Sequence, residues 1–201
     1  MASKQNHESM KIRSLVIFAV CLCMLFAVAW PLLNQVVASD QDMVESGKAF
    51  EEAAQVLFHP RCLNCHPAGD APTNGDDLHP HKFNVKRGPE GKGVEPLNCT
   101  RCHGNANKPG GPPGVANWHM PPANMPMVFQ GRTVGELCRQ LKDPAQNGGR
   151  TGEQIIEHID KDLLVFWGWN PGEGRTVPAM SHEEFSEKMH TWVEKGCACP
   201  E

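Results

Sequence analysis

The sequence predicts a small, mostly α-helical domain with long loops rich in proline and glycine. Three capping boxes stand in the last third of the chain, and each begins a stretch whose apolar residues recur at helical spacing. No stretch of any length alternates apolar and polar residues as a half-buried strand does. The chain has 19 glycines and 17 prolines, and residues 104–131 are so rich in both that they predict irregular backbone.

The first element in chain order is a predicted targeting segment, residues 1–38. It combines a basic start, an unbroken apolar run and small residues suited to cleavage: Lys4, Lys11, Arg13, Leu15–Trp30 and Val36–Ala38. The apolar run is close to the length of a membrane span, so an uncleaved N-terminal anchor is the alternative to a cleaved signal peptide. Both interpretations place the rest of the chain in the periplasm, with membrane attachment only if the segment is retained.

Residues 39–131 form the second region, which begins with a predicted helix to about Phe58. Its apolar positions fall largely on one stripe: Met43, Phe50, Ala54, Leu57 and Phe58. His59-Pro60 ends the helix directly before Cys62-Leu-Asn-Cys65-His66. The motif Cys99-Thr-Arg-Cys102-His103 follows after a loop, and a loop rich in proline and glycine follows in turn.

Residues 132–201 are predicted to be helical and to pack on the second region within the same domain. Their capping boxes are Thr133–Glu136, Thr151–Gln154 and Ser181–Glu184. The second and third helices carry apolar stripes: Ile155, Ile156, Ile159 and Leu163, then Phe185, Met189, Trp192 and Val193. Between these helices, Trp167–Arg175 is either a helix-ending turn with buried tryptophans or a surface that docks a partner.

The two CxxCH motifs carry the chemistry. Two thiols three positions apart can add to the two vinyl groups of one haem, and the next residue is then placed to bind the iron. We therefore expect two covalently attached haem c groups, one on Cys62 and Cys65 and one on Cys99 and Cys102. A zinc ribbon would space its cysteine pairs more closely, and a thioredoxin-like motif would occur once within an α/β pattern that is lacking here.

His66 and His103, the last residues of the motifs, are the predicted proximal iron ligands. The first candidates for the sixth ligands are His81 and His119, which lie in the loops before and after the second motif. The alternatives are His59, His79, Met120, Met125 and Met127. The remaining histidines stand on amphipathic helices and are predicted to be surface residues: His158, His182 and His190.

Cys138, Cys197 and Cys199 belong to neither motif and follow the targeting segment. In an oxidising compartment we expect one disulfide, from Cys138 to either Cys197 or Cys199. Spacing alone leaves both pairings open.

These motifs resemble those of the c-type cytochromes. More narrowly, His81–Gly91, Trp118–Met127, Trp167–Gly172 and the terminal Cys199-Pro200 are similar to a family of exported bacterial dihaem proteins, often labelled isoquinoline 1-oxidoreductase subunit. The resemblance covers nearly all of the chain after residue 38. It implies a cytochrome c-like domain and a periplasmic molybdenum hydroxylase as the electron donor, since the chain itself carries no molybdopterin or iron–sulfur pattern.

The expected function is electron transfer between a periplasmic donor and a downstream acceptor, in which other redox proteins are the partners. A net charge of −4 and the lack of basic tracts argue against a nucleic-acid partner. Two alternatives remain. One is a dihaem enzyme with an open iron, such as a peroxidase or a reductase, and the other is a membrane-anchored quinol-oxidising subunit.

Overall fold

The computed structural model describes residues 39–201, of which Met43–Glu201 form one compact unit. The predicted targeting segment, residues 1–38, lies outside the described residues. Helices and irregular segments make up the unit, which agrees with the mostly α expectation. Within residues 39–201 the only sheet is a hairpin of two-residue strands, β1 (Thr73–Asn74) and β2 (His79–Pro80). None of the helices in this range is long and apolar enough to cross a membrane.

Residues 39–57 are helical, and the further helices follow in chain order. They are α2 (Pro60–Leu63), α3 (Val134–Lys142), α4 (Gly152–Lys161), α5 (Leu163–Trp167) and α6 (His182–Glu194), with 3₁₀ turns η1 (Lys82–Asn84) and η2 (Cys99–Arg101) between α2 and α3. All three predicted capping boxes are confirmed, because both reciprocal hydrogen bonds are present at the starts of α3, α4 and α6. One detail was wrong: α4 ends before Leu163, which begins α5 and is 53% exposed.

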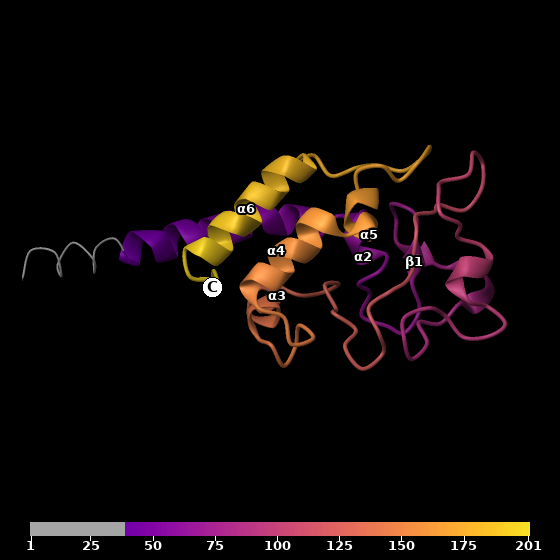
Figure 1. The fold of residues 1–201 in the computed structure, drawn as a ribbon, viewed down its shortest axis with the longest axis horizontal. Coiled ribbons are helices and arrows are strands. Elements are labelled where there is room, and N and C mark those ends of the chain that lie inside the picture. The colour runs from indigo at the N-terminus through magenta and orange to yellow at the C-terminus, as the bar shows by residue number, and fades with distance from the viewer. Residues whose placement is uncertain (1–38) are drawn as a thin grey trace, which may run out of the picture. The chain divides into compact units, whose positions relative to one another are not determined.

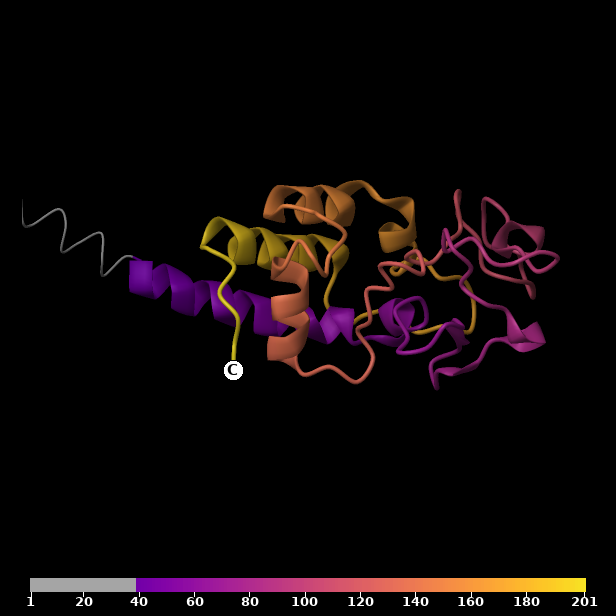
Figure 2. The same cartoon turned by 90° about the horizontal axis from the view of Figure 1, so that it is seen from below.

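The apolar core lies between residues 43–57, α3, α4 and α6, which gather at one end of the unit in Figures 1 and 2. Phe50 and Trp192 are fully buried, with ring centroids 5.0 Å apart. The buried Ser46 hydroxyl donates to the Trp192 carbonyl and accepts from the Ala198 N–H, which ties the C-terminal tail to the core. α2, the hairpin and the loops through residue 131 occupy the other end, so both CxxCH motifs lie in the region with little regular structure.

The structure settles two points that the sequence left open. Cys138 of α3 pairs with Cys199, and Cys197 is a free thiol. Trp167 is buried, and its indole N–H donates to Asn107 at 2.9 Å. The Trp169 indole donates to the Met180 carbonyl at 2.8 Å. The Trp167–Arg175 segment is therefore a packed turn at the end of α5.

Candidate functional site

The two CxxCH motifs adopt the same local turn. In the first, α2 begins with Pro60 at its first position, and the His66 N–H returns to the Cys62 carbonyl at 3.0 Å. In the second, the His103 N–H returns to the Cys99 carbonyl at 2.9 Å. Each turn brings the two cysteines and the following histidine onto neighbouring positions of a single coil, as the attachment of one group to all three requires.

Both motif histidines are held in the same way from outside the motif. The Nδ1 atom of His66 lies 2.7 Å from the Met127 carbonyl, and that of His103 lies 2.7 Å from the Pro113 carbonyl. Because a carbonyl oxygen only accepts hydrogen bonds, each Nδ1 carries the proton and donates it. The lone pair of each neutral ring is then on Nε2, and a donated Nδ1–H is the usual arrangement of a histidine that binds a metal.

A flat aromatic ring supports each of these imidazoles. His66 stacks on Phe129 with centroids 3.9 Å apart and an interplanar angle of 3°. His103 stacks on Trp118 at 4.4 Å and 2°, and Trp118 in turn packs edge-on against the buried Trp167. Stacking fixes the ring plane while the carbonyl fixes its rotation, so both Nε2 atoms have defined directions.

The site is desolvated, which keeps its groups neutral. Burial lowers the pKa of His66 to about 4, against the opposing effect of the Met127 carbonyl, and it also lowers the pKa of His103. Burial raises the pKa of the Cys62 thiol to about 12 and that of Cys65 to about 11. Cys99 of the second motif also contributes to the raised pKa of Cys65.

Two buried arginines flank the first motif. Arg61 pairs with Asp76, and its Nε is buried without a hydrogen-bond partner among the described residues. Arg87 is fully buried and donates to three backbone carbonyls: Pro121, Pro126 and Gly69. Both guanidinium groups act against the rise in the pKa of Cys65. A buried cation that lacks a full set of acceptors suits a site that receives an anionic group.

The other seven histidines of residues 39–201 fall into two classes. In four of them Nε2 makes a hydrogen bond: His59 to Thr176, His79 to Asn74, His182 to the Ile159 carbonyl and His190 to Asp160. In the other three, Nδ1 contacts an oxygen and Nε2 makes no hydrogen bond to the described residues: His81 with Lys82, His119 with Asn117 and His158 with Asp162. Only this second class presents the free Nε2 that the two motif histidines also present.

The three histidines with a free Nε2 have different surroundings. The ring centroid of His81 lies 6.1 Å from that of His103. His158 contributes to the lowered pKa of His66, and His119 contributes to the lowered pKa of Asp162. Of these three histidines, His81 is the one that the ring geometry brings beside a motif histidine, and it was a first candidate from the sequence.

The three candidate methionines differ in their backbone contacts and in their surroundings. The Met120 N–H donates to the Gly91 carbonyl at 2.8 Å, and its side chain is buried. The Met127 carbonyl holds Nδ1 of His66 and therefore lies at the opposite end of that ring from Nε2. Met125 packs beside Gly148, at the edge of an open hollow on α4.

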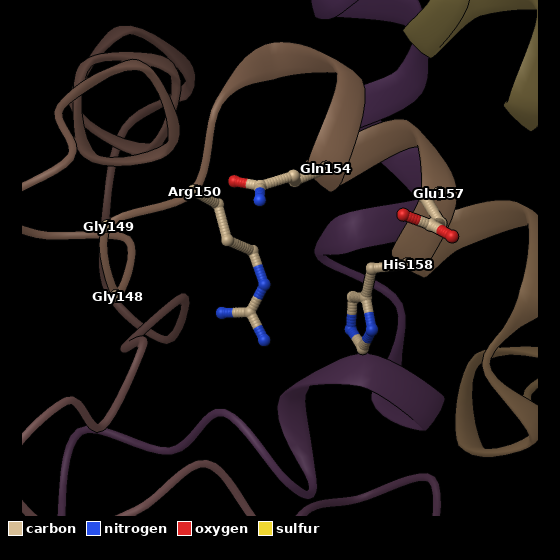
Figure 3. Close-up of a pocket in the computed structure, with 6 residues that line it drawn as sticks. All are labelled: Gly148, Gly149, Arg150, Gln154, Glu157 and His158. Atoms are coloured by element: carbon tan, nitrogen blue, oxygen red, sulfur yellow. The ribbon is translucent and has the colours of Figure 1, made fainter.

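That hollow measures about 460 Å³ and is lined by Gly148, Gly149, Arg150, Gln154, Glu157 and His158 (Figure 3). His158 is exposed, as the sequence predicted, but its position in the hollow was not expected. The contact of His158 with Asp162 could have been expected from the sequence, because residues four apart on a helix lie side by side.

Within residues 39–201, no group of three or more His, Cys, Asp or Glu side chains is arranged to hold a bare metal ion. Comparisons with protein-family models, curated proteins and solved structures found no match for this chain. The functional assignment therefore depends on the two motifs and on the contacts that surround them.

Proposed function

We propose that this chain is an exported dihaem c-type cytochrome of the family that it resembles, with a cytochrome c-like domain in the periplasm. It transfers electrons from a donor, such as a molybdenum hydroxylase, to a downstream acceptor. The observation that carries the proposal is the repeated site. In each CxxCH turn the histidine donates Nδ1–H to a backbone carbonyl, and its Nε2 makes no hydrogen bond to residues 39–201. Haem iron, once bound, supplies the reversible one-electron chemistry.

The chain's own residues attach and orient the group. Each motif thiol adds across one vinyl group, so a C–S bond forms, the double bond is consumed and no atom leaves. Cys62 and Cys65 serve the first group, and Cys99 and Cys102 serve the second. His66 and His103 present Nε2 to the iron, while the Met127 and Pro113 carbonyls keep the proton on Nδ1.

The two motifs influence one another, because Cys99 contributes to the raised pKa of Cys65. This coupling supports electron transfer rather than two independent sites. The buried cations Arg61 and Arg87 lower the Cys65 pKa, so they act on the first motif. There they would favour the reduced, less positive iron and could pair with propionate carboxylates.

In this proposal His81 would hold the same iron as His103. The ring centroids of the two histidines lie 6.1 Å apart, a separation at which two imidazoles could both bind one metal ion at about 2 Å per bond. His79 and His59 are less suitable because their Nε2 atoms already make hydrogen bonds.

The function is tested on the mature protein produced with a c-haem maturation system. We expect two covalent haems per chain by mass and by haemochrome absorbance, full reduction by dithionite, and low-spin spectra that carbon monoxide and peroxide leave unchanged. A chain without covalent haem would refute the proposal. A high-spin fraction that reacts with peroxide would instead favour the dihaem enzyme, and a mass that includes residues 1–38 would favour the anchored subunit.

The ligand assignment of the second haem predicts the effect of His81→Ala. Loss of the sixth ligand should convert one of the two haems to high spin and reduce the low-spin signal by about half. Electron paramagnetic resonance of the oxidised protein measures this change. His79→Ala is the matched control, since His79 lies two residues away with both ring nitrogens engaged by Asp77 and Asn74. Equal spectra for both variants would contradict the assignment.

A further inference from the structure

We infer that Asn107 is a positioning residue for His103, which sets both the basicity of this imidazole and the plane of its ring. The inference rests on the proposed function and deepens it, since it assigns a residue that tunes one of the two haems. Asn107 stands four residues after the second motif, in the loop rich in proline and glycine. Its side chain is half-buried and makes three hydrogen bonds to the described residues.

A single peptide group joins His103 to Asn107. The Pro113 carbonyl accepts from the Nδ1–H of His103 at 2.7 Å. The N–H of the same peptide group belongs to Gly114, and it donates to Oδ1 of Asn107 at 3.0 Å. Hydrogen bonds in such a chain polarise one another, so the bond to Oδ1 makes the Pro113 carbonyl a stronger acceptor. A stronger acceptor at Nδ1 makes the imidazole a more basic iron ligand.

The loop backbone is folded so that this peptide group reaches both side chains. Ala106 and Val115 form an antiparallel bridge, which turns the chain back on itself. A Cβ atom at Gly114 would lie 2.5 Å from the carbonyl oxygens of Gly104 and Ala106. Glycine at this position therefore allows a close approach of backbone to backbone, and the approach brings the Gly114 N–H within reach of Asn107.

The same oxygen of Asn107 also holds the aromatic stack beside His103. Oδ1 accepts from the indole N–H of Trp167 at 2.9 Å. Trp167 packs edge-on against Trp118 with centroids 4.8 Å apart, and Trp118 is the ring on which His103 stacks. One side-chain oxygen thus fixes both groups that orient the imidazole, which are the carbonyl at Nδ1 and the aromatic ring at its face.

The amide of Asn107 is itself fixed in one orientation. Two N–H groups donate to one of its ends, which must be the oxygen, and its Nδ2 donates to the Asn170 carbonyl at 2.8 Å. Gly172 lies so close that a Cβ atom there would approach the Asn107 side chain to 3.3 Å. The turn after α5 and the loop after the second motif are therefore joined through this side chain.

The first motif has no equivalent of Asn107 among the described residues. The carbonyl that holds His66 belongs to the peptide group of Met127 and Val128, and the Val128 N–H makes no hydrogen bond to residues 39–201. We therefore expect the polarising effect at the His103 iron alone. A more basic imidazole stabilises oxidised iron, so Asn107 should lower the reduction potential of that haem.

The test measures the reduction potentials of both haems in the holoprotein by spectroelectrochemistry. Asn107→Leu keeps the approximate size of the side chain but removes the acceptor, so the potential of one haem should rise. Asn107→Asp keeps both acceptor bonds and makes them charge-assisted, so the potential of the same haem should fall. Both variants should retain two covalent low-spin haems. Opposite shifts of one potential support the inference.

Asn147→Leu is the matched control. The Asn147 side chain also makes three hydrogen bonds to backbone groups, which belong to Leu141 and Arg150 and to neither motif. Loss of these bonds removes a comparable set of contacts from the loop between α3 and α4. We expect the control to lower the melting temperature and to leave both potentials unchanged.

Three results would overturn the inference and leave the cytochrome proposal intact. One is a lower melting temperature in Asn107→Leu with unchanged potentials, which is the result of a purely structural role. The second is a potential that falls in Asn107→Asp but is unchanged in Asn107→Leu, since the field of the added charge alone would explain it. The third is a shift of the same sign in both variants. If Asn107→Leu does not fold, Asn107→Ala replaces it with the same expected rise. Protein that carries no covalent haem would overturn the function itself.

Discussion

Replacement of Cys62 and Cys65 together by Ala is expected to yield a chain that retains one covalent haem instead of two. The two thiols are the attachment points of the first group, and no other free thiol stands within the same turn. Haemochrome absorbance per chain should fall by about half, and the intact mass should fall by one haem. The remaining spectrum should be that of the His103 site.

Cys197→Ser is the matched control for this prediction. Cys197 is also a free, partly buried cysteine, but it lies in the C-terminal tail and belongs to neither motif. We expect the control to keep two covalent haems. Unchanged haem content in the Cys62→Ala, Cys65→Ala double variant would show that the first motif does not attach a haem.

The second large effect is expected from removal of the Cys138–Cys199 disulfide. The bond links positions 61 residues apart, and a loop of this length should stabilise the folded chain by about 4 kcal/mol through the entropy of the unfolded state. Cys138 is fully buried in the core, so Cys138→Ala with Cys199→Ala should lower the free energy of unfolding by roughly that amount. Denaturant titration followed by circular dichroism measures the change.

The control for the disulfide is again Cys197→Ser, which alters a neighbouring thiol and leaves the bond intact. Its free energy of unfolding should stay within about 0.5 kcal/mol of the parent protein. If Cys197→Ser instead caused the larger loss, the partner of Cys138 would be Cys197, contrary to the structure.

Local features were predicted well because they depend on neighbours in the chain. The capping boxes at Thr133, Thr151 and Ser181 form the expected reciprocal bonds, since each requires only a side chain three residues away. The helix at residues 39–57 buries Phe50, Ala54 and Leu57, as its stripe predicted, but Met43 of the same stripe is 43% exposed. Leu163 was wrongly assigned to the apolar stripe of α4. Asp162 caps a new helix at this point, so α4 ends before Leu163.

The three capped helices of the last third and the two CxxCH motifs could be predicted from the sequence, because each is encoded within a few consecutive residues. Three contacts became visible only in the folded chain: the Cys138–Cys199 disulfide, the Met127 carbonyl that holds His66 across 61 positions, and the approach of His81 to His103. Such contacts depend on how distant segments pack and on which ring nitrogens remain free, and residue spacing does not encode either one.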